Sequence, residues 1–413
     1  MRVLYFHQHF STPQGSTGTR SYEFCKRLIA QGHSVTLVCG SYGGGVTGLS
    51  GPYRWGMRRG LVDGIDVIEF YLPYSNADRF IKRALVFLKF MFRSTRLALS
   101  AGYDMIFATS TPLTVAVPGI IAKVVRGRRF VFEVRDLWPE LPREMGVITN
   151  PAVLWGMDVL ESLAYRFADA CIGLAPGIVA GIKRKRADVA VAMIPNGSDV
   201  DMSSLSHPLP ANTRAALNQL DGKLKCVFTG THGIANGLDA VLDAAAEMKR
   251  RGRNDIALLF IGDGMLKPRL VKRAASEGLD NCIFLDPLPK QVLVSLQREV
   301  DVGLMILANV AAFYNGTSPN KFFDYLASGL PVLINYPGWL AKFVADQQCG
   351  VVVPPADPKA FADALERLAD FPAERQRMGQ QARRLAEQTF ARDLLARQFV
   401  TFLEGVARGK AVV

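Results

Sequence analysis

The sequence lacks the cysteine spacing of a disulfide-stabilised or zinc-binding protein. Its six cysteines include no C-x-x-C pair, and several lie in apolar, strand-like runs, at positions 25, 39, 171, 226, 282 and 349. Scattered cysteines of this kind are typical of reduced thiols in the core of a cytosolic protein. We therefore expect no disulfide framework and no cysteine-based metal site.

Long apolar runs are also lacking. No stretch reaches the roughly 20 consecutive apolar residues that a helix needs to cross a bilayer. No signal peptide precedes the first apolar run, Val3–Phe6, and there are no internal repeats or low-complexity tracts. At 413 residues the chain has room for two domains with full cores. These features predict a protein that is soluble or peripheral at a membrane.

Nucleic-acid-binding motifs are missing although the formal net charge is +12. There is no helix-turn-helix, RNP-like or zinc-finger pattern, so nucleic acid is not the expected partner. Basic residues gather instead in Arg79–Arg96, RFIKRALVFLKFMFRSTR, where they are interleaved with Phe, Ile, Leu and Met. A basic amphipathic helix binds the interface of anionic membranes. A core helix whose Lys and Arg side chains reach solvent fits the pattern equally well.

Strand-like and helix-like segments alternate along the chain, which predicts parallel sheets with helices on both faces. Strands are expected near 2–6, 34–39, 65–70, 104–108, 129–134, 170–174 and 190–194, and near 224–229, 256–261, 282–285, 301–306, 331–334 and 350–353. Residues 196–220, rich in Ser, Pro, Asn and Asp, are predicted to be a loop or linker. The expected fold is α/β, with two doubly wound, Rossmann-like domains, 1–195 and 196–391, facing a central cleft.

The turn after the first strand, His7–Arg20, is glycine-rich, but Gly15 and Gly18 do not form G-x-G-x-x-G. The second strand also ends without the acidic residue that holds the ribose of NAD. The turn therefore predicts a small backbone loop at the cleft and no redox cofactor. His7 and His9 form an H-x-H pair, which we interpret as lining the cleft rather than binding a metal.

Residues 313–338, FYNGTSPNKFFDYLASGLPVLINYPG, carry the strongest binding signal. Ser318 followed by Pro319 predicts a helix start capped by the Ser hydroxyl. Helix N-termini attract anions, and Lys321 in the first turn is unfavourable unless an anion lies beside it. Asp324, one turn further, can bind sugar hydroxyls. A phosphate next to a polyol is the simplest ligand for this set, and a plain surface helix with a good cap is the alternative.

The predicted strand 129–134 ends in two charged residues, Arg135 and Asp136. Such residues lie at the mouth of a cleft, where a catalytic acid or base belongs. Asp136 is therefore our candidate for contact with an acceptor hydroxyl. Alternatively, the two side chains pair with each other or cap the next loop.

The segment 313–338 resembles the carboxyl-terminal signature of the GT-B glycosyltransferases of family 4. The matching positions are Asp324, Ala327, Gly329, Pro331 and Val332. The resemblance implies that Asp324 holds the ribose hydroxyls of a nucleotide-sugar, while Gly316 stands where the family has its first acid. The T-S-P-N-K version is similar to a bacterial branch that includes L-fucosamine transferases and related surface-polysaccharide enzymes.

Residues 192–201, AMIPNGSDVD, resemble the I-P-N-G-x-D hinge that opens the family's second domain. By position, the D-x-D of Asp199 and Asp201 belongs to this hinge, so we do not interpret it as a metal site. The final helix, 392–407, is similar to the terminal helix that packs back onto the first domain.

The resemblance also implies roles for residues across the chain. Thr231 and Asn236 stand where the family usually has an arginine and a lysine on the donor diphosphate, so Lys321 is left to stabilise the leaving group. Arg135 stands where the family often has a histidine. The remaining expected substrate-binding positions are Gly15, Gly18, Gly262, Ser318 and Asn320.

The resemblance implies a retaining glycosyltransferase that uses a nucleoside diphosphate sugar, with UDP preferred over GDP and without a metal or cofactor. The expected acceptor is a polyprenyl-diphosphate-linked saccharide at the cytoplasmic face of the membrane, in O-antigen, capsule or exopolysaccharide synthesis. One alternative is a soluble transferase with a small-molecule acceptor. Another is a GT-B scaffold that has lost catalysis and serves as a partner subunit, because Gly316, Thr231 and Asn236 all depart from the family pattern.

Overall fold

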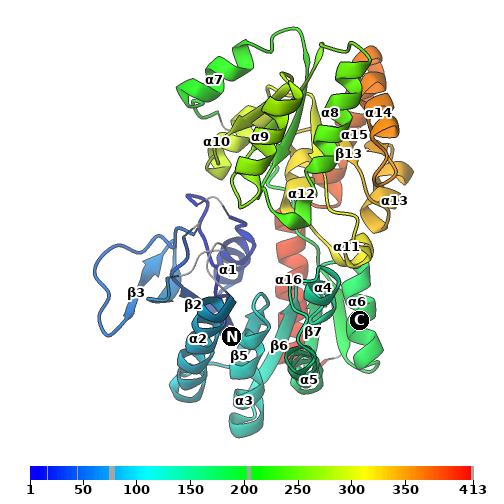
Figure 1. Cartoon of the computed structure of the whole chain (residues 1–413). Coiled ribbons are helices and arrows are strands. Elements are labelled where there is room, and N and C mark those ends of the chain that lie inside the picture. Colours follow the sequence, from blue (N-terminus) through cyan, green and yellow to red (C-terminus); the bar gives the residue numbers. More distant parts are fainter. Residues whose placement is uncertain (16, 44, 74–79, 202–205, 411–413) are drawn as a thin grey trace. The chain divides into compact units, whose positions relative to one another are not determined.

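The computed structural model describes residues 1–410 apart from residues 16, 44, 74–79 and 202–205. The chain forms two compact units. The first consists of Met1–Asn196, Asn315–Ser318 and Arg392–Val413, and the second of Gly197–Tyr314 and Pro319–Ala391. Each unit is a sheet flanked by helices (Figure 1), so the predicted α/β class is confirmed.

The first unit is built on an eight-stranded sheet with the order β3-β4-β2-β1-β5-β6-β7-β8. Neighbouring strands are parallel except β3 and β4, which are antiparallel. The strands are β1 (Arg2–Phe6), β2 (Ser34–Gly40), β3 (Met57–Val62), β4 (Ile65–Phe70), β5 (Met105–Thr109), β6 (Arg129–Val134), β7 (Ala170–Gly173) and β8 (Ala190–Met193). All except β3 correspond to predicted strands.

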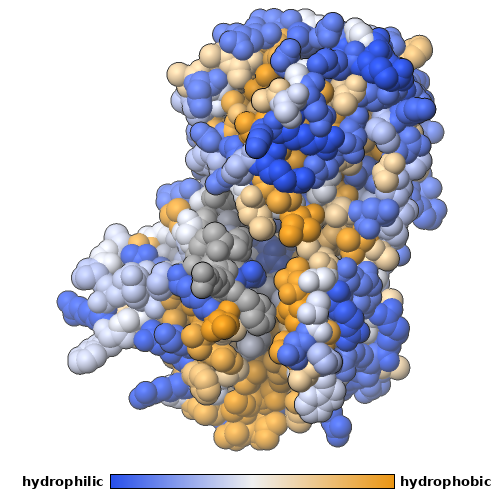
Figure 2. Space-filling model, in the orientation of Figure 1, coloured by the Kyte–Doolittle hydropathy of each residue, from blue (hydrophilic) through white to orange (hydrophobic). Residues whose placement is uncertain are grey.

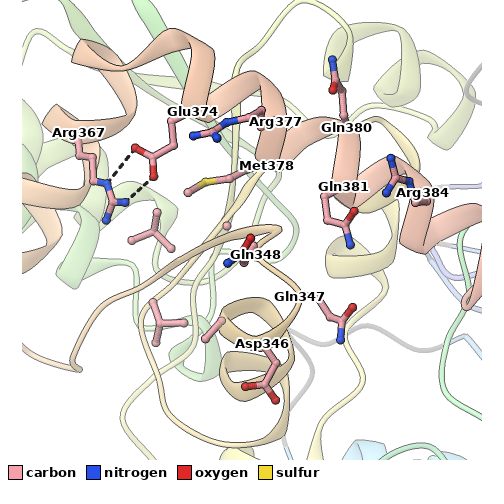
Figure 3. Close-up of a pocket in the computed structure, with 14 residues that line it drawn as sticks. Asp346, Gln347, Gln348, Arg367, Glu374, Arg377, Met378, Gln380, Gln381 and Arg384 are labelled. Carbon is pink, nitrogen blue, oxygen red and sulfur yellow. Dashed lines mark hydrogen bonds and ion pairs between the residues drawn. The ribbon is translucent and has the colours of Figure 1, made fainter.

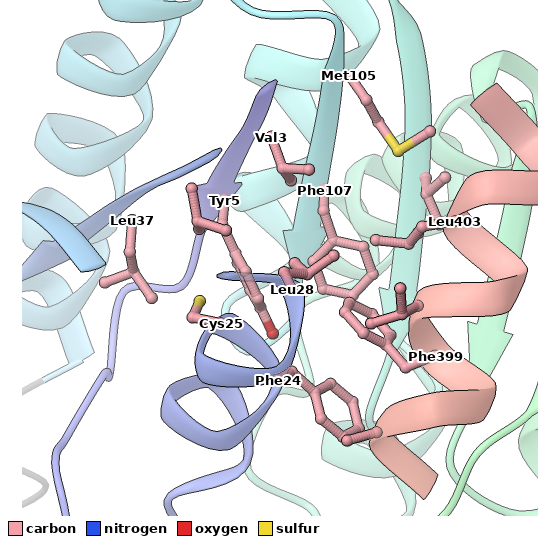
Figure 4. Close-up of a cluster of buried hydrophobic side chains, with 14 of the residues drawn as sticks. Val3, Tyr5, Phe24, Cys25, Leu28, Leu37, Met105, Phe107, Phe399 and Leu403 are labelled. Carbon is pink, nitrogen blue, oxygen red and sulfur yellow. The ribbon is translucent and has the colours of Figure 1, made fainter. Parts of the chain in front are cut away.

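The helices of the first unit cover both faces of this sheet. They are α1 (Arg20–Ala30), α2 (Phe80–Ser100), the 3-10 turn η1 (Leu113–Val115), α3 (Ala116–Arg126), α4 (Glu140–Glu144), α5 (Pro151–Phe167), α6 (Pro176–Lys185) and α16 (Arg392–Ala407). Helix α16 belongs to the core of this unit: Phe399 stacks on Phe24 with ring centroids 4.3 Å apart and meets Phe107 edge-on at 5.0 Å (Figure 4). The bounds of α16 agree with the predicted final helix.

The second unit contains a six-stranded parallel sheet with the order β11-β10-β9-β12-β13-β14. Its strands are β9 (Leu224–Thr229), β10 (Ile256–Ile261), β11 (Cys282–Leu285), β12 (Val302–Met305), β13 (Val332–Ile334) and β14 (Gly350–Val352). Its helices are α7 (Ala211–Asn218), the 3-10 turn η3 (Ile234–Asn236), α8 (Asp239–Arg250), α9 (Lys267–Glu277), α10 (Lys290–Gln297), α11 (Ala311–Gly316, which crosses into the first unit), α12 (Asn320–Ala327), α13 (Trp339–Asp346), α14 (Pro358–Asp370) and α15 (Pro372–Gln388). Every strand here was predicted.

The predicted loop 196–220 is wrong over part of its length, because α7 lies inside it. The segment ANTRAALN contains the good helix formers Ala, Arg and Leu, which outweigh the polar composition of its surroundings. The cysteines are free, and all except the partly exposed Cys282 are buried, as predicted. Among the described residues, no helix combines the length and the apolar character that crossing a membrane requires.

Candidate nucleotide and acceptor sites

Lys321 is the centre of a polar cluster in the second unit. It lies in the first turn of α12, and its Nζ donates a hydrogen bond to Asn236 Oδ1 at 2.8 Å. The same Nζ lies 3.9 Å from the centre of the Phe228 ring, a cation–π distance. Asn236 Nδ2 in turn donates to the carbonyl oxygen of Thr231 at 2.6 Å. The neutral Asn236 therefore positions the lysine.

The charge of Lys321 depends on what lies beside it. Burial lowers the pKa of Lys321 from 10.5 to about 7, because removing an ammonium group from water disfavours its charged form. At neutral pH the ligand-free side chain is therefore only partly charged. A phosphate bound next to it would favour the ammonium form again. A lysine whose charge depends on its neighbour is suited to binding an anionic group of the substrate.

Two loops beside Lys321 meet backbone to backbone. A Cβ on Gly262 (φ +148°) would lie 1.9 Å from the carbonyl oxygen of Gly230, so a larger residue cannot occupy this position. A Cβ on Gly230 would lie 3.3 Å from Lys321 Nζ. The structure thus brings Gly262, Asn236 and Lys321 into one region, at the carboxyl ends of β9 and β10.

His232 is a buried residue of the same loop that the sequence analysis did not identify. Neither ring nitrogen has a hydrogen-bond partner among the described residues. Its ring packs among those of Phe228, Phe260 and Phe284, with centroids 6.0, 6.3 and 6.1 Å away. Burial, assisted by the charge of Lys267, lowers the pKa of His232 to about 4. The imidazole is therefore neutral at physiological pH.

Asp324 lies in an ion-pair cluster that the sequence analysis also missed. Its Oδ1 is 3.4 Å from Nζ of the buried Lys290, which pairs with Asp199 as well. The D-x-D residue Asp199 thus takes part in a salt bridge at the start of α10. The oxygens of a carboxylate can also accept hydrogen bonds from sugar hydroxyls. Lys290 is 34 residues before Asp324 in the chain, so no local motif could reveal the contact.

The predicted capping role of Ser318 is wrong. Helix α12 begins at Asn320, with Pro319 before it in an extended conformation, and no side chain caps it. The hydroxyl of Ser318 instead accepts a hydrogen bond from the backbone N–H of Asn196 at 2.9 Å, and its carbonyl accepts from Asn196 Nδ2 at 2.6 Å. Ser318 is therefore engaged with the end of the first unit's main segment, and Asn320 opens the helix.

Asp136 in the first unit follows β6, as predicted, and is bonded to a residue that follows β5. Its Oδ2 accepts a hydrogen bond from Thr111 Oγ1 at 3.2 Å. Burial raises the pKa of Asp136, although the nearby Arg135 and the bond from Thr111 oppose this effect. A carboxylate with a raised pKa is a better proton acceptor, which suits contact with a hydroxyl that loses its proton.

The side chain of Arg135 lies next to a histidine. Its Nη1 lies 3.4 Å from Nε2 of the buried His7, and its backbone N–H donates to Ser110 Oγ at 3.0 Å. Burial first, and Arg135 second, hold the pKa of His7 well below its usual range. In neutral His7, Nε2 accepts from the guanidinium and Nδ1 carries the proton. Arg135, which stands where the family often has a histidine, is thus a neighbour of a different histidine, His7.

The glycine-rich turn of the first unit connects β1 with α1. The N–H of Gly15 donates to the carbonyl of Thr12 at 3.1 Å, and Gly18 lies two residues before α1. His9, at the start of the turn, lies against Tyr42 and Phe87, with ring centroids 5.1 and 6.2 Å away. The predicted residues Gly15, Gly18, Arg135 and Asp136 thus all follow carboxyl ends of strands in one sheet.

A cavity of about 930 Å³ lies elsewhere in the second unit. Figure 3 shows its polar walls, which come from α15, from the end of α13 and from the segment before β14; Gln348, Arg377, Gln381 and Arg384 are among the residues drawn. None of the predicted site residues lines it. The cavity therefore does not coincide with the predicted site.

Comparison with known proteins agrees with this geometry. Residues 15–197 match the "Glycosyl transferase 4-like domain" family, and residues 223–370 match the family "Glycosyl transferases group 1". The solved structure of HepE from Anabaena in complex with UDP and glucose superimposes with a TM-score of 0.70 at 16% identity, over 98% of this chain and 100% of that one.

Two sequence relatives are glycosyltransferases. The probable glycosyltransferase WbjE of Pseudomonas aeruginosa is 23% identical over 74% of this chain and 77% of its own length. Alpha-D-kanosaminyltransferase of Streptomyces kanamyceticus is 27% identical over 40% of this chain, and the match spans only 41% of that relative's length.

Two α/β units, each a largely parallel sheet flanked by helices, define a GT-B protein. Because both of its halves match glycosyltransferase families, the chain belongs to the GT-B glycosyltransferases of family 4.

Proposed function

We propose that the chain transfers a sugar, with retention at the anomeric carbon, from a UDP-linked donor to a polyprenyl-diphosphate-linked saccharide at the inner face of a bacterial cell membrane. The product would enter O-antigen, capsule or exopolysaccharide synthesis. The observation that carries the proposal is the Lys321–Asn236 pair on the donor side.

The donor diphosphate gains negative charge as the glycosidic bond breaks, and Lys321 supplies a positive charge for it. Asp324, paired with Lys290, offers carboxylate oxygens to the ribose hydroxyls. The structural neighbour HepE was solved with UDP and glucose, which supports UDP as the nucleotide. In the first unit, Asp136 would accept a hydrogen bond from the acceptor hydroxyl and take its proton as the new bond forms.

Helix α2 supports a lipid-linked acceptor. One face is buried along Val86, Phe90, Ser94 and Ala98, whereas the opposite face exposes an apolar stripe at helical spacing, Ile81, Leu85, Leu88, Phe92 and Leu99. Arg79, part of the predicted segment, lies outside the described residues. The helix carries five basic residues and no acidic one over 80–100. Figure 2 shows apolar residues gathered over α2 and α3.

The start of α2 also reaches the acceptor side of the first unit. Phe87 lies against the ring of His9, and the charge of Arg83 helps to lower the pKa of His9 to about 4, after the larger effect of burial. Arg83 and Arg135 thus bring positive charge to the neighbourhood of His9. A diphosphate attached to a lipid on the α2 surface would meet these cations.

The exposed stripe of α2 gives a direct prediction. Replacing Ile81, Leu85, Leu88 and Phe92 with serine should abolish sedimentation with anionic liposomes at low salt, while donor hydrolysis without acceptor stays close to the wild-type rate. Phe90 is left in place, because it packs on Phe70 in the core. Separately, replacing Lys82 and Lys89 with glutamate should weaken binding by about 1 kcal/mol per cation removed. Failure of the wild-type protein to sediment would contradict the membrane part of the proposal.

The pKa of Lys321 gives a second prediction. Above pH 7 the free lysine is largely neutral, so binding of UDP should take up a proton, and affinity should fall by up to about tenfold per pH unit between pH 7 and 9. Calorimetry in buffers of different ionisation enthalpy measures this uptake. Lys321→Met should bind more weakly and without proton uptake. If the affinity for UDP does not change with pH in either the wild type or Lys321→Met, the placement of Lys321 beside the diphosphate is contradicted.

The proposed reaction is tested by incubating the protein with UDP-sugars and vesicles that contain a polyprenyl-diphosphate-linked saccharide. Radiolabel from the donor should enter the lipid fraction as UDP is released. Transfer to water-soluble saccharides alone would favour the soluble alternative. Binding of UDP without transfer or hydrolysis of any donor would favour the non-catalytic partner.

A further inference from the structure

An exposed tryptophan lies beside the apolar stripe of α2. Trp55 precedes β3 and is 98% exposed. β3 is the edge strand of its sheet, and its residues Met57 and Leu61, 39% and 76% exposed, form with Trp55 a row of exposed apolar residues that the exposed Arg59 interrupts. Trp55, Met57, Leu61 and the nearby stripe of α2 together expose more apolar surface than a single scattered side chain, and such a patch points to a partner.

Two contacts place the turn before β3 next to α2. The Arg93 guanidinium of α2 donates to the carbonyl of Gly56, the residue after Trp55, at 2.6 Å, and lies 5.5 Å from the centre of the Phe70 ring. The same Gly56 carbonyl accepts from the N–H of Tyr71 at 2.9 Å. The turn that carries Trp55 is therefore tied to the middle of α2, one residue from the exposed Phe92.

The charges around Trp55 suit an anionic surface. Arg54 is exposed directly before it, and the exposed Arg93 joins it from α2. Two acids of the neighbouring strand β4 are paired with arginines of β3: Glu69 with Arg58 at 2.7 Å and Asp66 with Arg59 at 2.7 Å. Tryptophan prefers the headgroup region of a bilayer, where its ring is half apolar and its N–H meets polar groups.

We propose that the edge of β3, through Trp55, is a second contact with the anionic lipid bilayer. This inference rests on the proposed membrane contact of α2 and adds to it. A single surface helix is free to roll about its own axis, whereas a second contact to one side of the helix stops the roll. The two contacts together set the orientation of the first unit, and with it the direction in which the β-strand ends and Asp136 face the lipid-linked acceptor.

The experiment uses the full chain, vesicles of phosphatidylglycerol and phosphatidylcholine, and the same vesicles with brominated acyl chains. Trp55→Ala should weaken vesicle binding about tenfold and lower transfer to the lipid-linked acceptor, with hydrolysis of the donor unchanged. On binding, wild-type emission should shift to the blue and be quenched by the brominated lipid, and Trp55→Phe should lose most of both effects. Trp155→Ala is the matched control, because Trp155 is 70% exposed on α5, away from β3, and should bind as wild type does.

The outcomes separate this inference from the proposed function. Wild-type protein that does not bind vesicles overturns both. If the wild type binds vesicles, Trp55→Ala binds equally well and Trp55→Phe is quenched as strongly as the wild type, only the role of Trp55 is overturned. Equal losses from Trp55→Ala and Trp155→Ala also contradict a specific contact at β3. A change of oligomeric state in Trp55→Ala, without a change in vesicle binding, would assign the row to a contact between copies of this chain.

Discussion

Lys321→Ala is expected to lower the rate of sugar transfer by roughly 10²–10³-fold, the usual cost of losing one group that stabilises charge in the transition state. The ammonium lies in the first turn of α12, held by Asn236 and by the ring of Phe228. Because the bound diphosphate is already charged, the affinity for UDP should fall as well. Transfer rate and calorimetry of UDP, measured side by side, check both effects.

Two control variants make the result specific. Lys321→Met keeps most of the side-chain volume, so equal losses in both variants assign the effect to the charge rather than to a cavity. Lys342→Ala removes an exposed lysine of the same unit, which forms an ion pair with Asp346 one helical turn away, and it should change neither quantity. If Lys321→Ala leaves rate and affinity unchanged, the donor site is wrongly placed.

Asp136→Asn should reduce transfer by roughly 10²–10⁴-fold, the range for removal of a general acid–base group, while the affinity for UDP stays close to that of the wild type. The amide keeps the shape of the side chain and its bond with Thr111 but cannot take a proton. Because Asp136 belongs to the first unit and Lys321 to the second, the two substitutions should separate acceptor chemistry from nucleotide binding.

The matched control for this variant is Glu140→Gln, which removes a partly exposed carboxylate four residues further along the chain, paired with Arg184 at 3.4 Å. It should transfer sugar at nearly the wild-type rate. Loss of UDP binding in Asp136→Asn would contradict the division of roles between the two residues. An unchanged transfer rate would show that Asp136 takes no part in the reaction.

The sequence predicted the parallel strands because each is a short, continuous apolar run between helical segments. It missed β3, where Arg58, Arg59 and Gly60 break the apolar pattern. The dipeptide Asp63–Gly64, with φ of +51° and +86°, forms the turn between β3 and β4 and was the one available signal for this hairpin.

The site was predicted only where its residues lie within one motif. Lys321 and Asp324 share a helix, so their spacing was informative. The partners of these residues come from other elements: Asn236 lies 85 residues before Lys321, and Lys290 approaches Asp324 from α10. The hydroxyl of Ser318 was assigned to its own helix, but it bonds to Asn196, 122 residues away. Contacts of this range depend on packing, which local sequence does not record.

The central claim, that the second unit is a nucleoside diphosphate site, is tested most directly by thermal unfolding with UDP, GDP, ADP, TDP and NADP. UDP should stabilise the protein most and GDP second, by about 2.7 kcal/mol for a ligand present at a hundredfold excess over its Kd. NADP should have no comparable effect. Clear stabilisation by NADP, with none by UDP or GDP, would contradict the account.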